Sequence, residues 1–261
     1  MVYAMVRQRG SPVIVPSGYA IALHFVDPIS RGRVMSVASW DTSVETSMHT
    51  PLTDLLGCRY PIIQTAMGWV ADANLVAATS SAGGFGFLAG AVMTPEEIEQ
   101  GILAIKAKTD APFGVNFHMY VPNAEDIVDL CVTHKVKAVS YSRSPAGRAI
   151  EKLKRAGIVC IPTVGAKKHA VKAVELGADA LVIQGGEGGG HTGSVATSIL
   201  LPEVRSAVSV PIAAAGGFRD GAGLVAALAM GADGIAMGTR FLLTQESPVP
   251  EATKQIYLAT P

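Results

Sequence analysis

The chain has 261 residues, of which 49% are hydrophobic and 16% are charged, and its 21 basic side chains balance 21 acidic ones. Binding to nucleic acid or to an anionic membrane surface would need a basic excess, so we expect neither partner. Because no run of 18 apolar residues occurs and the three cysteines lack the spacing of a zinc site, we expect a reduced, cytoplasmic protein without a membrane span or a bound metal.

The first part of the chain shows no clear helical or strand period. Residues 1–47 contain four arginines and many serines, and Met48 opens a far more regular pattern. We therefore expect an irregular N-terminal extension over residues 1–47 and a folded domain over residues 48–261.

From Leu52 onward, short apolar runs alternate with amphipathic stretches of helical length, which is typical of repeated strand and helix units. The eight predicted strands are Pro61–Thr65, Phe85–Ala89, Phe113–Met119, Ala138–Ser142, Val159–Val164, Ala180–Gln184, Pro211–Ala215 and Gly234–Gly238. The predicted helices are Asn74–Ala82, Pro95–Thr109, Ala124–Lys135, Ala146–Ala156, Lys167–Leu176, Ser198–Val208 and Gly221–Met230. This repetition predicts a (β/α)8 TIM barrel, with an open doubly wound sheet as the alternative.

Chemistry in such a barrel lies at the C-terminal ends of the strands. The segment after the sixth predicted strand, residues 185–193, has glycine at six of its nine positions. Glycine lets the backbone approach a bulky ligand closely, and His191 in this loop can transfer a proton near neutral pH. His118, at the end of the third strand, is either a second wall of the same pocket or a structural histidine.

Glycines also follow the last two strands, at Gly216-Gly217 and Gly238-Thr239. Barrels bind phosphate at this place through backbone N–H groups. Amide side chains, which offer both donors and acceptors as the pyrimidine edge of a flavin requires, lie on three other strands: Gln64, Asn116 and Gln184. The expected ligand is therefore a planar heterocycle that carries a phosphate.

Six segments resemble the nitronate monooxygenase family, the 2-nitropropane dioxygenase-like flavoproteins, and the likeness runs from about Leu52 to Pro250. These segments are Pro61–Gly68, Ser81–Gly86, Pro112–Asn116, Gln184–His191, Ala214–Gly217 and Met237–Phe241. The resemblance implies a TIM barrel of the FMN-binding type. The FMN contacts that it implies are Gln64, Ala66, Met67, Asn116, Gln184, Gly189, Gly216, Gly217, Ala236, Met237, Gly238 and Thr239.

The resemblance also implies an activity, with His191 as the catalytic base. Bound FMN would oxidise an alkyl nitronate or nitroalkane and then react with O₂, so that a carbonyl compound and nitrite form. Met67–Asp72 also resembles the flavin-dependent enoyl-acyl-carrier-protein reductases, which use NAD(P)H, and a flavin-binding protein with little turnover is a third reading. Family members usually continue into a lid domain, which we expect to be largely absent here, and a homodimer is compatible with the sequence.

Overall fold

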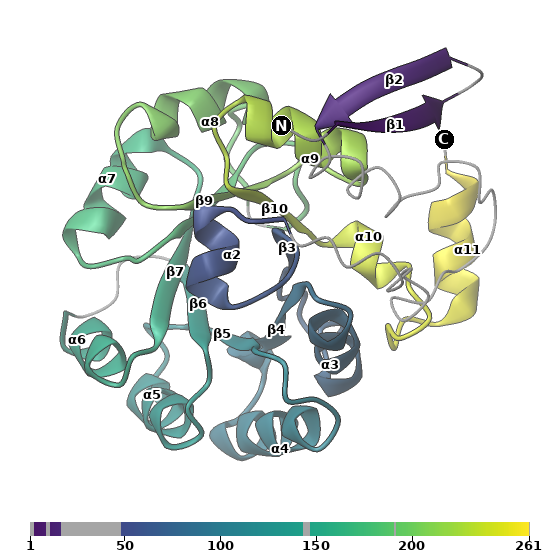
Figure 1. The fold of residues 1–261 in the computed structure, drawn as a ribbon. Helices are drawn as coiled ribbons and strands as arrows, with labels where there is room; N and C mark the ends of the chain where they lie inside the picture. Colours follow the sequence, from purple (N-terminus) through teal and green to yellow (C-terminus); the bar gives the residue numbers. More distant parts are fainter. Residues whose placement is uncertain (1–2, 9–10, 17–47, 143–146, 191, 261) are drawn as a thin grey trace.

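Eight parallel strands close into a barrel in the order β10-β3-β4-β5-β6-β7-β8-β9, so each strand pairs with its neighbour in the chain and the last pairs with the first. The computed structural model describes residues 3–8, 11–16, 48–142, 147–190 and 192–260. Helices surround the ring of strands (Figure 1). This closure confirms the predicted (β/α)8 barrel and removes the open sheet as an alternative.

The predicted elements are present, and their ends differ from the predicted ends by at most three residues. The barrel strands are β3 (Ile62–Gln64), β4 (Phe85–Ala89), β5 (Gly114–His118), β6 (Ala138–Ser142), β7 (Val159–Val164), β8 (Leu181–Gln184), β9 (Ile212–Ala215) and β10 (Gly234–Met237). The helices between them are α3 (Ala73–Ser81), α4 (Pro95–Lys106), α5 (Ala124–Thr133), α6 (Gly147–Arg155), α7 (Lys167–Glu175), α8 (Thr197–Arg205) and α9 (Gly221–Ala229).

Four short elements and a hairpin were not predicted. The short elements are α2 (Pro51–Leu56), the 3₁₀ turn η2 (Gly90–Val92), α10 (Thr239–Leu242) and α11 (Glu251–Ala259). Within the extension, β1 (Tyr3–Gln8) pairs antiparallel with β2 (Ser11–Pro16), so this part of the chain is not irregular throughout. The sequence did not indicate β2, because Val13-Ile14-Val15 is a continuous apolar run and lacks the apolar–polar alternation that predicts a strand.

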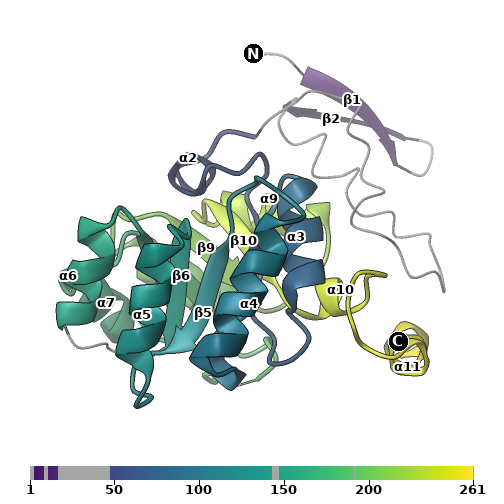
Figure 2. The same cartoon turned by 90° about the horizontal axis from the view of Figure 1, so that it is seen from below.

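Helix α2 closes the end of the barrel at which the strands begin (Figures 1 and 2). Its Leu52 and Leu56 are fully buried and belong to the cluster that fills the barrel interior, together with Phe85 and Phe87. A Cβ on Gly234, the first residue of β10, would lie only 2.6 Å from Cδ2 of Leu52. The helix is therefore a plug that seals the interior at the end where the strands begin.

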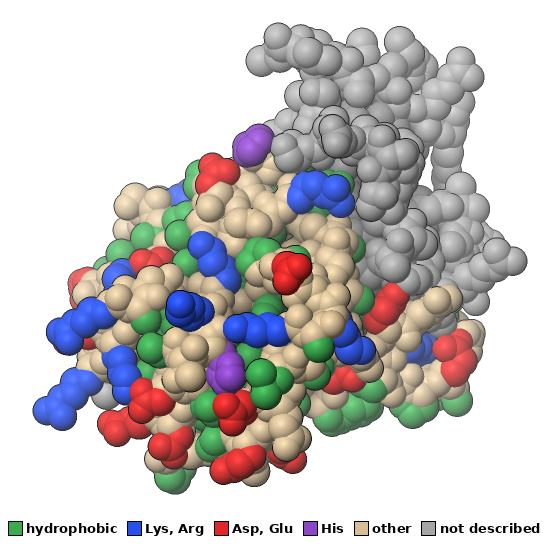
Figure 3. Space-filling model, turned by 60° about the horizontal axis from the view of Figure 1, so that its bottom comes forward, with side chains coloured by type: hydrophobic (Ala, Val, Ile, Leu, Met, Phe, Trp, Pro, Cys, Tyr) green, Lys and Arg blue, Asp and Glu red, His purple; other side chains and the backbone are tan. Residues whose placement is uncertain are grey.

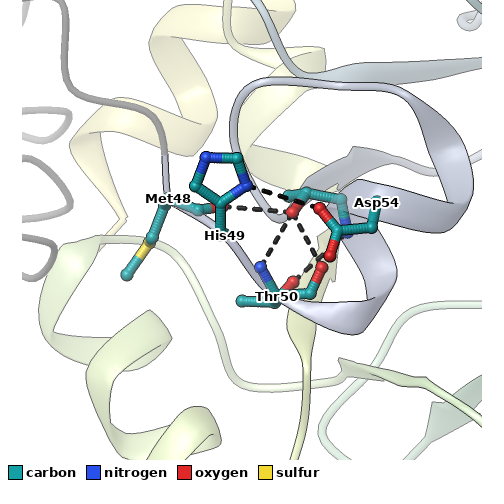
Figure 4. A network of polar contacts seen from close by, with 5 residues as sticks. Met48, His49, Thr50 and Asp54 are labelled. Carbon is teal, nitrogen blue, oxygen red and sulfur yellow. Dashed lines mark hydrogen bonds and ion pairs between the residues drawn. The ribbon is translucent and has the colours of Figure 1, made fainter.

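A capping box starts this helix (Figure 4). The hydroxyl of Thr50 accepts a hydrogen bond from the Thr53 N–H at 3.2 Å, and the Thr53 hydroxyl accepts one from the Thr50 N–H at 2.9 Å. The Thr53 hydroxyl also lies 3.1 Å from the carbonyl oxygen of Met48. These contacts satisfy N–H groups that a helix start leaves without partners, which lets so short a helix hold its place.

Basic and acidic side chains both occur across the face drawn in Figure 3. Ion pairs also link neighbouring elements of the barrel: Lys154 Nζ lies 2.7 Å from Asp179 Oδ1, and Lys167 Nζ lies 3.1 Å from Glu203 Oε2. Exposed pairs of this kind contribute little to stability. None of the described helices is both long and apolar enough to cross a membrane.

The plug makes a stability prediction. Leu52→Ala leaves a cavity at the base of the barrel, so we expect the free energy of unfolding to fall by about 2 to 5 kcal/mol in urea denaturation. Leu103→Ala is the matched control, because Leu103 is 51% exposed on α4 and should change stability by less than about 0.5 kcal/mol. Equal effects of the two substitutions would show that α2 does not support the barrel.

Candidate active site at the mouth of the barrel

Alternation along the strands decides which side chains reach the open end of the barrel. In β5, Phe117 packs into a core cluster with helical side chains, so Asn116 and His118 lie on the opposite, inner face. They pair in register with Ser140 and Ser142 of β6. Nδ2 of Asn116 donates to the carbonyl oxygen of Ser140 at 3.1 Å, and Nδ1 of His118 lies 3.2 Å from the hydroxyl of Ser142.

The same alternation places polar side chains around the rest of the ring. Ile63, Ile161 and Val182 belong to the interior cluster, so the residues two positions further along β3, β7 and β8 also face inward. We call this polar ring at the C-terminal strand ends the mouth: Thr65, Asn116, His118, Ser140, Ser142, Thr163 and Gln184.

The glycine-rich loop after β8 is folded onto the ends of β8 and β9. The N–H of Gly185 donates to the carbonyl oxygen of Ala215 at 3.0 Å, and Nε2 of Gln184 donates to the carbonyl oxygen of Gly189 at 2.8 Å. A Cβ on Gly185 would lie 2.0 Å from the hydroxyl oxygen of Thr197, so this position needs glycine for packing. The predicted base, His191, lies outside the described residues.

A carboxylate fixes this loop to the start of α8, and we call the contact the Glu187–Thr197 clasp. Both carboxylate oxygens of Glu187 accept from the Thr197 N–H, at 3.0 and 2.9 Å, and Oε2 lies 2.8 Å from the Thr197 hydroxyl. Thr197 is buried, and its hydroxyl also lies 3.0 Å from the carbonyl oxygen of Gly216. The clasp therefore joins the β8 loop, the start of α8 and the end of β9.

The surroundings of Glu187 change its acidity. Burial raises its pKa, but hydrogen bonds from its own backbone and from Thr197 outweigh burial and hold the pKa below the ordinary value of 4.5. A negative charge is also favourable here because the N-terminal end of a helix is positive. The ionised carboxylate is thus the form that holds the loop.

Two consecutive glycines follow β9 in the left-handed backbone region. Gly216 has φ = 100° and Gly217 has φ = 79°, conformations that side chains other than glycine rarely adopt. Within the described part of the chain, neither of their N–H groups donates a backbone hydrogen bond. Both N–H groups therefore lack a backbone acceptor among the described residues at the end of β9.

The segments after β3 and β10 meet beside these glycines. The N–H and the hydroxyl of Thr65 lie 3.1 and 3.2 Å from the carbonyl oxygen of Met237. A Cβ on Gly238 would lie 3.3 Å from Sδ of Met67. The predicted residues Ala236 and Met237 are buried in the barrel wall, whereas Thr239 is exposed.

Gln64 is a predicted contact whose side chain the structure turns away from the mouth. Its side chain is fully buried, Nε2 donates to the carbonyl oxygen of Phe87 at 3.2 Å, and Oε1 lies beside Gly86 and Val76 of α3. Because Ile63 faces inward, its neighbour Gln64 faces the helices. The Gln64 amide thus joins β3 to β4 behind the barrel wall, and its contact with a ligand stays a prediction.

The remaining predicted residues lie at the mouth or beside it. Ala66 packs against the interior cluster, and Met67 packs against the outer one that includes Met237. Gly189 and Gly190 have open space where a Cβ would stand, so their backbone can be approached from outside. The inward hydroxyls of Ser140 and Ser142 were not among the predicted contacts, although the alternation along β6 would have indicated both serines.

No cysteine is poised as a nucleophile. Cys58, Cys131 and Cys160 are free thiols, and burial raises the pKa of each to about 12. A thiol with so high a pKa is protonated at neutral pH and reacts slowly. The polar groups that the mouth offers are therefore amides, hydroxyls and the imidazole of His118.

The clasp predicts a pH-dependent contribution to stability. The folded pKa of Glu187 is depressed, so the stabilisation is complete above pH 4.5 and is lost as the pH falls below that value. Glu187→Gln should therefore melt at a lower temperature than the parent at pH 7, and the difference should shrink as the pH is lowered below 4.5. A difference in melting temperature that stays constant from pH 7 to pH 3 would contradict the clasp.

Comparison with known proteins shows to which family the chain belongs. The chain is 54% identical to the (3aS,4S,5R,7aS)-5-hydroxy-7a-methyl-1-oxo-octahydro-1H-indene-4-carboxyl-CoA dehydrogenase of Rhodococcus jostii over 214 residues. The aligned part covers 82% of this chain and 61% of that protein. The chain thus spans about three fifths of that relative's length. FabK from Thermotoga maritima superposes with a TM-score of 0.78 at 38% identity, over 81% of this chain and 68% of that one.

A second solved structure is similar, the nitroalkane oxidase of Streptomyces ansochromogenes. It superposes with a TM-score of 0.73 at 32% identity, over 79% of this chain and 72% of that one. Residues 49–260 match the family described as nitronate monooxygenase, which includes every barrel strand and the whole mouth. The chain belongs to the nitronate monooxygenase family.

Proposed function

We propose that this chain is the FMN-binding barrel of an oxidoreductase whose reaction takes place at the mouth. The observation that carries the proposal is the pair of left-handed glycines, Gly216 and Gly217, whose N–H groups have no backbone acceptor among the described residues. They lie beside Gly238 on the neighbouring strand end, which is where barrels of this class bind phosphate.

The residues of the mouth suit FMN in three respects. Backbone N–H groups at the ends of β9 and β10 match a phosphate anion. Asn116 and Gln184, half-buried on inward positions, offer amide donors and acceptors to a pyrimidine edge. The open surroundings of Gly189 and Gly190 let a flat ring system approach the backbone.

When bound, FMN supplies a group that accepts two electrons from an organic substrate and passes them to an oxidant such as O₂. The protein's own part is to hold the cofactor by the phosphate, to orient the substrate and to move a proton. We propose His191 for the proton, since it follows directly on the glycine loop that the clasp fixes. In its neutral form, the imidazole removes the proton from the carbon next to the activating group of the substrate.

Alkyl nitronates and their parent nitroalkanes are the first substrate class that we propose, with O₂ as the oxidant and a carbonyl compound and nitrite as products. The family description and the similar nitroalkane oxidase support it. A nitro group acidifies the adjacent C–H bond, so that one base and one electron acceptor suffice for the oxidation.

A CoA thioester is the second candidate, and a specific observation favours it. The Rhodococcus relative, named for a carboxyl-CoA substrate, is 54% identical, whereas the nitroalkane oxidase is 32% identical. A thioester also acidifies the neighbouring C–H bond, so the same mouth serves both classes. The two candidate substrates therefore need the same flavin and the same base, and they differ in the group that is attached to the acidic carbon.

Phosphate binding at β10 can be tested without turnover. Thr239 is exposed at the first position of α10, where an acidic residue is tolerated by the helix. Thr239→Glu places a negative charge beside the phosphate site, so we expect the dissociation constant for FMN to rise by about tenfold or more, which is ~1.4 kcal/mol. Thr239→Gln is the neutral control and should change it by less than about threefold.

Riboflavin separates a phosphate effect from damage to the fold, because it lacks the phosphate. Its affinity, measured by fluorescence quenching, should be equal in the parent and in both Thr239 variants. If Thr239→Glu weakens riboflavin as much as FMN, the phosphate does not lie at this strand end.

The role of His191 predicts a difference between two forms of one substrate. With a neutral nitroalkane, His191→Asn should lower kcat/KM by about 100-fold or more, because the proton has lost its acceptor. With the preformed nitronate the loss should be far smaller, since no proton has to be removed. Equal losses with both forms, measured by nitrite release, would show that His191 is not the base.

A further inference from the structure

His118 lies in the mouth, but the reaction proposed above gives it no role. Its half-buried ring stands on the inner face at the end of β5, and Nδ1 lies 3.2 Å from the hydroxyl of Ser142. The ring of Tyr120 stacks on it, with 5.1 Å between centroids and 20° between the planes. One nitrogen and one ring face are thus engaged, which fixes how the imidazole is turned.

The closed ring of strands sets His118 across from the phosphate site. In the order β10-β3-β4-β5-β6-β7-β8-β9, β5 stands four places from β9 in either direction, and β6 stands four places from β10. His118 and Ser142 therefore face the glycines that follow β9 and β10. A ligand anchored at those glycines has to extend toward β5 and β6 if it spans the mouth.

The contact with Ser142 also decides which ring nitrogen is left for a ligand. Among the described residues, the imidazole of His118 has one polar partner, the Ser142 hydroxyl on Nδ1, and Nε2 has none. When the Ser142 hydroxyl donates to Nδ1, the hydrogen of the neutral imidazole resides on Nε2. Nε2 is then a donor held in a fixed direction at a half-buried site.

We propose that His118 is a substrate-binding residue whose Nε2–H donates a hydrogen bond to an oxygen of the substrate, while Ser142 and Tyr120 position the ring. This inference rests on the proposed function and names a contact for it. Both candidate substrate classes carry an acceptor oxygen next to the acidic carbon, in the nitro group or in the thioester carbonyl. A donor on this oxygen stabilises the charge that develops there when the proton leaves, and it does not compete with His191 for the proton.

The first test removes the donor and then restores it. In the FMN-loaded protein with propyl nitronate, His118→Leu should raise KM by about tenfold, whereas His118→Gln, whose amide nitrogen can reach the place of Nε2, should recover most of the loss. The dissociation constant for FMN should stay within twofold in both variants. His169→Leu is the control for loss of a histidine, because His169 is exposed on α7. A KM within twofold of the parent for His118→Leu overturns the proposal.

The positioning role is tested separately on Ser142. Ser142→Ala removes the partner of Nδ1 and should raise KM as well, while Ser142→Thr keeps a hydroxyl and should leave KM close to the parent value. The ¹⁵N signals of the His118 ring should report the hydrogen on Nε2 in the parent and in Ser142→Thr, and a mixture of tautomers in Ser142→Ala. Identical ring signals in all three proteins would show that Ser142 does not hold the ring.

A ring-nitrogen titration separates failure of this inference from failure of the proposed function. If FMN does not bind or neither substrate class is oxidised, the proposed function fails, and the titration still decides the role of His118. Adding propyl nitronate or, separately, propanoyl-CoA to the purified protein should move the Nε2 signal of His118 but not that of His169. No movement with either compound overturns the proposal, whatever the activity.

Discussion

Closure of the parallel barrel is the constraint on which the rest of the molecule depends. Because β10 pairs with β3, all eight strands end on one rim, and residues far apart in the sequence become neighbours there. Thr65 reaches the carbonyl oxygen of Met237, 172 positions along the chain, only because the ring is closed. The opposite end has to be sealed, and the buried leucines of α2 do this. One end of the barrel is thus closed by packing, and the other carries the candidate site.

Glycine serves two different purposes in this barrel. At Gly114, Gly185 and Gly234 a Cβ would collide with a neighbour, at 2.3, 2.0 and 2.6 Å respectively, so packing alone requires glycine there. At Gly189 and Gly190 nothing stands within 4 Å of the Cβ position. The glycine-rich loop therefore divides into a packed first part, held by the clasp, and an open second part that leads to His191. Only the open part is evidence for a ligand.

The sequence was sufficient for the barrel because the alternation of strands and amphipathic helices is strong and regular. It did not reveal α2, since six residues are too few to show a helical period, and α2 owes its place to the cap at Thr50 and to the leucines beneath the barrel. The strand ends were predictable as the place of the site, because every strand of a parallel barrel ends on the same rim.

The direction of individual side chains was less predictable, and two strands show why. β5 reads Gly-Val-Asn-Phe-His, so its alternation alone places Asn116 and His118 on one face. β3 has the sequence Ile-Ile-Gln and is buried on both faces, so its sequence does not indicate which face of the sheet Gln64 occupies. The clasp was beyond sequence reasoning, because the partner of Glu187 is the first residue of α8, ten positions on, and only folding of the loop brings the two together.

The central claim is that the mouth holds a flavin that an organic substrate reduces. An anaerobic absorbance titration of the FMN-loaded protein with propyl nitronate, with propanoyl-CoA and with NADH tests it most directly. The account predicts that propyl nitronate or propanoyl-CoA bleaches the flavin spectrum and that air restores it, with nitrite released in the case of the nitronate. Bleaching by NADH alone would favour a reductase instead. A protein that retains no flavin would contradict the account.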